Sequence, residues 1–237
     1  MQETKCNNTL LNSTLSKAWN SCHTSAVDAI GELGGITIAW NAQAIELTDI
    51  YANHHFVQAK FDVIGTNVHG HLTNVYFPQT ANNKISILDI LALLNANRSL
   101  PLWIMGGDFN MITKLEEKIG GIIRLDSESE HFKQFIQSNW LIDFPKNNRI
   151  FTWNNKRSSP HQIASRLDRS LITDNVIHLG GGGPMPLRLE AQVGSSAGST
   201  LWCAICQVAR KHATDNCHML QKYVQARDNC CATFVYW

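Results

Sequence analysis

An acid and an amide, two residues apart, follow two glycines in the stretch IMGGDFNMI, residues 104–112. Asp108 and Asn110 would project to the same side if the chain stayed extended, and Gly106 and Gly107 allow the chain to leave a strand at unusual backbone angles. A carboxylate and an amide on one face suit phosphate chemistry, because the acid orients water or a metal ion and the amide donates to a phosphoryl oxygen. The same residue types are also common in turns for conformational reasons, so the stretch taken alone favours a turn.

Three further motifs surround this stretch in a defined order. Glu3 lies in QET, Tyr76 in NVYFP and Asp168 in SRLDRSL. Together with GGDFNMI, EKIGG and FTWNN, the ordered set resembles the endonuclease/exonuclease/phosphatase superfamily, and more narrowly the endonuclease domain of plant LINE-type (non-LTR) retrotransposons. The resemblance covers roughly residues 2 to 175.

The resemblance implies a role for each matching residue. Glu3 and Asp108 would bind Mg²⁺ (or Mn²⁺), a hard cation that prefers carboxylate oxygen and keeps several waters. Tyr76 would assist at the phosphate, and Asp108 with Asn110 would position the attacking water and hold the phosphoryl group. Asp168 would orient a catalytic histidine, so the implied catalytic set is Tyr76, Asp108, Asn110 and Asp168.

Each of these residues also has a purely structural interpretation. Glu3 could be an acid at a frayed terminus, and Tyr76 could be a core aromatic residue. Asp168 could be the ion-pair partner of Arg166 or Arg169, which flank it in the sequence. For any single residue, the structural and the functional interpretations have about equal weight. The ordered set as a whole favours the functional interpretation.

The sequence departs from the family pattern at both ends. Family members begin with a strand that carries an asparagine well before the glutamate, whereas Glu3 is almost the first residue here. They also end in a Ser-Asp-His motif, which is absent from the 237 residues, and His178 lacks the preceding acid. Loss of a general acid–base group lowers a rate by about 10²–10⁴. We therefore expect a truncated remnant of a Mg²⁺-dependent DNA endonuclease, weakly active or inactive; the alternative is a non-catalytic nucleic-acid- or zinc-binding protein.

The C-terminal residues carry a second motif. Five of the seven cysteines lie in the last 35 residues, and the spacing C-x2-C-x5-H-x4-C resembles the zinc knuckle of Gag proteins. Three thiolates and an imidazole suit tetrahedral Zn²⁺, and the net charge of +2 over residues 203 to 229 suits weak contact with single-stranded nucleic acid. A disordered cysteine-rich tail is the alternative. The expected zinc ligands are Cys203, Cys206, His212 and Cys217.

Composition sets the domain organisation that must position these residues. The chain is 44% hydrophobic with a net charge of +1, which allows one sizeable core and gives no overall charge that favours nucleic acid. We expect a domain over residues 1–179, a Gly/Ser/Pro-rich linker over 180–200, in which six of 21 residues are glycine, and the tail over 201–237. Neither a signal peptide nor a membrane segment is visible, so an intracellular protein, nuclear or cytoplasmic, is expected; the oligomeric state is open.

Hydrophobic patterning predicts mixed strands and helices within the first domain. Ser127 and Glu130 have capping-box spacing ahead of a helix with a Phe132, Phe135, Ile136 stripe. Together these elements predict an α/β (α+β) sandwich of two packed mixed sheets flanked by helices, incomplete, with a flexible tail. The other expected elements are strands at 34–40, 54–65, 71–78, 101–107, 150–155 and 165–173 and a helix at 84–98.

Overall fold

A computed structural model describes most of the expected first domain. The described residues are 9, 13, 15, 22–28, 35–65, 68–96, 102–122, 124–144 and 151–173. The predictions for Glu3, His178, the linker and the zinc-binding tail lie outside them.

A six-stranded sheet forms the centre of the fold. Its strands run in the order β3 (Ile45–Ala52), β4 (Phe56–Val63), β5 (His69–Tyr76), β6 (Trp103–Asp108), β11 (Asp168–Thr173) and β8 (Leu141–Phe144). Neighbouring strands pair antiparallel except β5 and β6, which are parallel. The crossover between that parallel pair contains α2 (Ala81–Ala96), because parallel neighbours cannot be joined by a tight turn.

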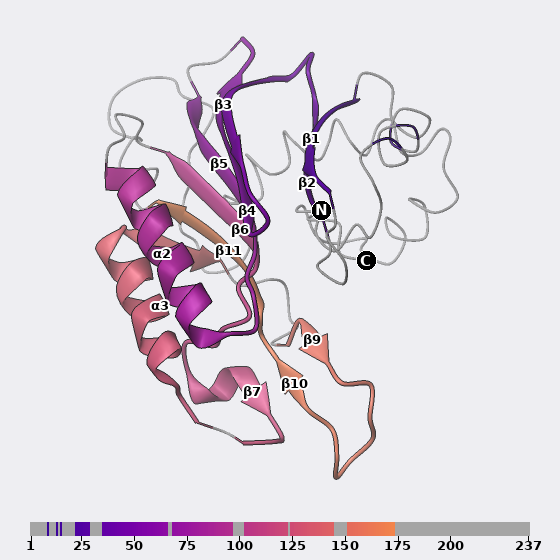
Figure 1. The fold of residues 1–237 in the computed structure, drawn as a ribbon, viewed down its shortest axis with the longest axis vertical. Helices are drawn as coiled ribbons and strands as arrows, with labels where there is room; N and C mark the ends of the chain where they lie inside the picture. Colours follow the sequence, from indigo (N-terminus) through magenta and orange to yellow (C-terminus); the bar gives the residue numbers. More distant parts are fainter. Residues whose placement is uncertain are drawn as a thin grey trace.

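Two layers flank this sheet (Figure 1). The helices α2 and α3 (Ser127–Ser138) lie side by side against one face, and the antiparallel pair β1 (Cys22–Val27) and β2 (Ile36–Asn41) lies on the other side. The two helices run parallel, because Lys84 binds Glu128 near their first turns and Asn95 donates to Asn139 near their ends. The fold is thus an α+β sandwich.

Each face of the central sheet has its own apolar core. The core on the helix side includes Phe56, Met105, Leu171 and, from α3, Phe132. Val57 belongs to the core that faces β2, as do residues of β6 and β11. Adjacent residues of β4 thus serve opposite faces, because successive side chains of a strand alternate. The second core joins the central sheet to β1 and β2, with members Ile36, Ile38, Trp40, Ile45, Val57, Phe61, Leu102, Ile104 and Ile172.

A small third sheet extends from the end of the central sheet where β6 finishes and β11 begins. It pairs β7 (Lys118–Ile119), β10 (Ala164–Ser165) and β9 (Trp153–Asn154), and a short 3-10 turn, η1 (Leu115–Glu117), precedes β7. Figure 1 shows the β9–β10 hairpin as an arm that projects away from the helices and the central sheet.

Most of the expected elements are confirmed, with ends displaced by a few residues, and three predictions need correction. The strand expected at 150–155 is only Trp153–Asn154, and the one at 165–173 is divided between β10 and β11. The capping box at Ser127 is wrong: Asp126 is the extended N-cap residue and makes no side-chain capping bond, and its carboxylate accepts a hydrogen bond from Arg124 at 2.8 Å. The central sheet is mixed, as predicted, and β1 and β2 pair antiparallel. No described helix is both long and apolar enough to cross a membrane.

Candidate active site

Three of the expected site residues occupy one row across three neighbouring strands. The strand register pairs Asp108 of β6 with Tyr76 of β5 on one side and with Asp168 of β11 on the other. Residues paired across neighbouring strands point to the same face, with Cβ atoms about 5 Å apart in an antiparallel pair. The sheet therefore brings together side chains that are up to 92 positions apart in sequence, and we call these three residues the site row.

The site row lies on the face of the sheet that is turned toward β1 and β2. Ile104 and Ile172 belong to the core between the sheets, and Asp108 and Asp168 lie an even number of residues from them on the same strands. Tyr76 itself packs against that core. All three side chains of the site row are half-buried, so the row lies at the rim of the core.

Asn110 reaches the site row through a turn and not along an extended chain. Its φ of 51° is left-handed, a conformation that asparagine tolerates better than most residues, and Gly107 before it has φ 144°. The Asn110 backbone N–H donates to Asp108 Oδ1 at 2.8 Å. The expectation that the two side chains share a face by strand alternation is therefore wrong. The functional and the turn interpretations of this stretch are compatible, because the turn itself brings Asn110 back to Asp108.

The carboxamide of Asn110 is held in place by two partners. Its Nδ2 donates to the carbonyl oxygen of Phe77 at 2.7 Å, and its Oδ1 accepts from Gln79 Nε2 at 3.0 Å. An amide nitrogen carries two hydrogens, so among the described contacts one N–H is left for a ligand oxygen. Lys84, a buried residue of α2, donates to the Asn110 carbonyl oxygen at 2.8 Å and to Glu128 at the same distance. The side chain and the backbone of Asn110 are both fixed before any ligand arrives.

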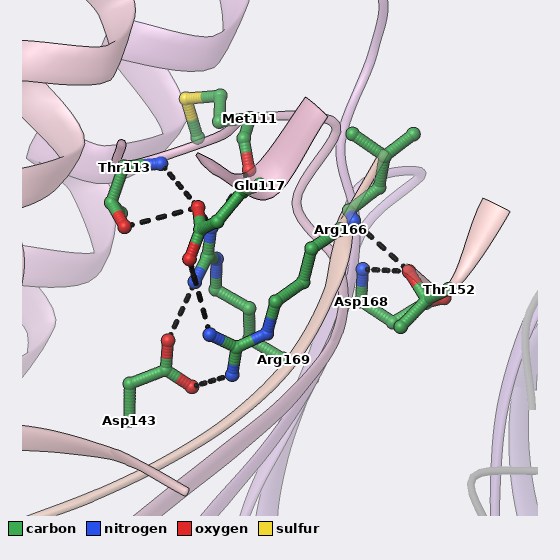
Figure 2. Close-up of polar contacts among 9 residues, drawn as sticks. Met111, Thr113, Glu117, Asp143, Thr152, Arg166, Asp168 and Arg169 are labelled. Carbon is green, nitrogen blue, oxygen red and sulfur yellow. Dashed lines mark hydrogen bonds and ion pairs between the residues drawn. The ribbon is translucent and has the colours of Figure 1, made fainter. Parts of the chain in front are cut away.

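The segment that carries Asp168 is held by Thr152, the residue directly before β9. Thr152 Oγ1 accepts from the backbone N–H groups of Leu167 and Asp168, each at 3.0 Å. Figure 2 shows the bond between Thr152 and Asp168. The Phe109 N–H donates to the carbonyl oxygen of Leu167 at 3.0 Å, which joins this segment to the residue between Asp108 and Asn110. The two carboxylates of the site row are therefore held in register by the backbone on both strands.

A buried cluster of four charged side chains lies on the opposite face of the sheet, beneath the site row. It consists of Glu117, Asp143, Arg166 and Arg169, and we call it the Glu117 cluster (Figure 2). Arg169 is fully buried, and its guanidinium carbon lies 5.4 Å from the ring centre of Phe132. Both arginines that flank Asp168 in the sequence bind Glu117 and Asp143.

The arginines change the acidity of Glu117. Burial by itself raises the pKa of this carboxyl, but hydrogen bonds and charge from Arg169, the Thr113 N–H and the charge of Arg166 outweigh burial and hold the pKa at about 2. Glu117 is therefore ionised at neutral pH although only 2% of it is exposed. We included Glu117 in the EKIGG motif but assigned it no role from the sequence. Its presence as an acid within an ordered set of family motifs was the one feature of the sequence that could have indicated a role.

The donor set suits a hard cation only in part. Mg²⁺ is commonly bound through one or two carboxylates, with waters and substrate phosphates completing its shell, and Asp108 and Asp168 provide two neighbouring carboxylates. The described part of the chain contains no group of three or more His, Cys, Asp or Glu side chains arranged to hold a metal ion. Asp108 and Asp168 could thus supply two carboxylate ligands, and Glu3, the expected further ligand, lies outside the described residues.

Comparison with known structures identifies the fold. The endonuclease domain of TRAS1, a telomere-specific non-LTR retrotransposon, is similar with a TM-score of 0.52 and 14% identity, over 76% of this chain and 83% of that one. Also similar are an endonuclease/exonuclease/phosphatase family protein from Bacteroides thetaiotaomicron (TM-score 0.46, 12% identity, 68% of this chain and 64% of that one) and D. rerio TDP2 complexed with single strand DNA product (0.48, 12%, 71% and 68%).

The chain thus shares the α+β sandwich fold of the TRAS1 endonuclease domain, which confirms the predicted fold class. Within that class, the similar structures include the endonuclease domain of a non-LTR retrotransposon. No family model matches the sequence, and no curated protein matches it. At these identities the likeness concerns the fold, so the chemistry must be argued from the site itself.

Proposed function

We propose that this chain carries the phosphodiester-binding site of a Mg²⁺-dependent DNA endonuclease derived from a plant LINE-type retrotransposon, with weak hydrolytic activity. The observation that carries the proposal is the site row: Tyr76, Asp108 and Asp168 share one face of three adjacent strands, and Asn110 is turned back to Asp108. A phenol, two carboxylates and an amide in one place supply donors for phosphoryl oxygens and ligands for a hard cation.

Each residue has a defined part in this proposal. Asp108, with Glu3, would hold Mg²⁺ (or Mn²⁺), which when bound neutralises phosphate charge and lowers the pKa of a bound water. The remaining Asn110 N–H and the Tyr76 hydroxyl would donate to phosphoryl oxygens. Asp168 lies next to Asp108; the family resemblance gives it the role of orienting a catalytic histidine, and the Ser-Asp-His motif that supplies this histidine does not occur in the 237 residues. Since Asn110 is held by Phe77 and Gln79, its donor needs little reorganisation when substrate binds.

We expect weak activity because the 237 residues lack the sequence motif that would supply a proton-accepting histidine. Positioning of phosphate and water accelerates hydrolysis fully only when a general base completes the arrangement. The Ser-Asp-His motif that the family resemblance implies has no counterpart in the 237 residues. We therefore expect binding of metal and DNA to be preserved better than turnover, with a rate lower by about 10²–10⁴ than in an enzyme with the histidine.

Binding and turnover of the full chain test the proposal together. Fluorescence anisotropy of a short DNA duplex should show affinity that rises with Mg²⁺, and relaxation of supercoiled plasmid should be slow. Asp108→Asn should abolish the Mg²⁺-dependent gain, whereas Asp62→Asn, at an exposed position on β4, should retain it. Equal Mg²⁺ dependence in Asp108→Asn and the unmodified chain would contradict the site. Rapid nicking that Asp108→Asn abolishes would preserve the site and contradict weak activity.

We also propose that the tail binds Zn²⁺ and contacts single-stranded nucleic acid. The spacing C-x2-C-x5-H-x4-C and the net charge of +2 over residues 203 to 229 support this proposal. A short segment with these ligands folds only when the metal binds. This binding would be independent of the site row.

A further inference from the structure

The carboxylate of Glu117 accepts five hydrogen bonds from two different parts of the chain. From the segment that follows Asn110, the Thr113 N–H and hydroxyl donate to Oε2 at 2.7 and 3.1 Å. From the segment around Asp168, Arg166 Nη1 and Arg169 Nη1 donate to Oε1 at 3.1 Å each, and Arg169 Nη2 donates to Oε2. One buried carboxylate therefore joins both segments.

Further contacts strengthen this link. The Arg166 backbone N–H donates to the carbonyl oxygen of Glu117 at 2.8 Å, two residues before Asp168. Arg169, the residue after Asp168, also donates to the carbonyl oxygen of Met111, the residue after Asn110, at 3.4 Å. Figure 2 shows Met111, Thr113, Glu117 and the two arginines gathered on the side of the helices, with Asp168 and Thr152 on the opposite side.

Asp143 of β8 is a second carboxylate that binds the same two arginines as Glu117. A comparison of the two therefore distinguishes the loss of a negative charge from the loss of the contact with Thr113. Asp143 binds Nη2 of Arg166 at 2.7 Å and Nη1 of Arg169 at 2.6 Å. Among the described contacts, Asp143 binds these arginines and not the Thr113 segment. Replacement of either carboxylate by an amide therefore takes one negative charge from the same cluster, but only replacement of Glu117 also weakens the side-chain link between Thr113 and the two arginines.

We propose that Glu117 is a positioning residue for the candidate site: its carboxylate sets the separation of Asn110 from Asp168 by joining the segments that carry them. The expected effect of Glu117 on the binding of Mg²⁺ and phosphate rests on the proposed function. Glu117 lies on the face of the sheet opposite the site row, so it acts without contact with substrate or metal. Its part is to keep the amide donor and the second carboxylate in place when phosphate and cation bind.

Two measurements on the full chain test this inference, with Glu117→Gln and Asp143→Asn as matched variants. Amide hydrogen exchange followed by NMR reports local opening at Asn110, Thr113 and Asp168. Glu117→Gln should speed exchange at all three by about tenfold or more beyond any change at the paired amides of β4 and β5. Asp143→Asn should leave Asn110 and Thr113 unchanged. Calorimetric titration with Mg²⁺ should show a weaker affinity in Glu117→Gln than in Asp143→Asn.

The outcomes distinguish this inference from the proposed function. If exchange in Glu117→Gln rises uniformly over the sheet, or is unchanged at Asn110, Glu117 has only a general stabilising role and the inference is wrong. If both variants speed amide exchange at Asn110 equally, the loss of a negative charge from the cluster explains the effect. The contact between Glu117 and Thr113 then has no specific role, and the inference is also wrong. If the unmodified chain binds Mg²⁺ no better than Asp108→Asn, the proposed function fails, while the exchange pattern still decides whether Glu117 positions the two segments.

Discussion

Neutralisation of Glu117 should destabilise the fold in a way that depends strongly on pH. Burial would raise the pKa of this carboxyl, but Arg169, Thr113 and Arg166 together hold it at about 2, against an ordinary value of 4.5. Each pKa unit corresponds to about 1.4 kcal/mol, so the shift is worth about 3 kcal/mol of stability at neutral pH. Because only 2% of Glu117 is exposed, solvent screens this contribution little.

The sign of the effect follows from the direction of the shift. A carboxyl whose pKa is lower in the folded state contributes its full stability above the unfolded value and loses it as pH falls toward the folded value. The contribution of Glu117 should therefore be complete at pH 7, reduced to about 40% at pH 3, and nearly gone at pH 2. Other carboxyls also titrate in this window, but they are common to the unmodified chain and the variant.

Urea unfolding of the unmodified chain and of Glu117→Gln, followed by tryptophan fluorescence between pH 7 and pH 2.5, measures this difference. Glutamine has nearly the shape of the protonated acid, so the difference in unfolding free energy should be about 3 kcal/mol at pH 7 and should shrink as the pH falls. Asp62→Asn, at an exposed position, serves as the control and should show little difference at any pH. A difference between Glu117→Gln and the unmodified chain that stays constant over this range would refute the assignment of the ion cluster as its source.

Three further expectations concern other parts of the chain. Gly70→Ala should prevent correct pairing of β5 with β6, because its Cβ would lie 2.2 Å from the carbonyl oxygen of Leu102, whereas Gly65→Ala, with φ 78° and open space around it, should cost only about 1 kcal/mol in thermal unfolding. Lys84→Met should lower the unfolding free energy by about 3 kcal/mol, because it leaves a glutamate on α3 without its buried partner; a melting temperature equal to that of the unmodified chain would contradict this. Co²⁺ titration of the full chain should give a thiolate charge-transfer band from residues 203–217, and no band means that the tail is not a zinc site.

Sequence patterns identified the main elements because their signals are local. The apolar run that becomes β6 ends in two glycines, and the helix α3 shows its buried stripe at Phe132 and Phe135 in the spacing of the residues alone. By contrast, β1 reads CHTSAV and has no strong apolar pattern, so it was not expected. It forms a strand because it pairs with β2 along its whole length, an interaction that no local pattern encodes.

The sequence by itself determined which residue types were available for phosphate chemistry and the order in which they occur. Only the tertiary structure decided that Tyr76, Asp108 and Asp168 share a row, because strand register follows from pairing between distant segments. It also decided that Asn110 returns to Asp108 through a left-handed turn. Glu117 shows the same limit most clearly: its arginine partner lies 52 positions away, so the buried bond between them exists only once the sheet has formed.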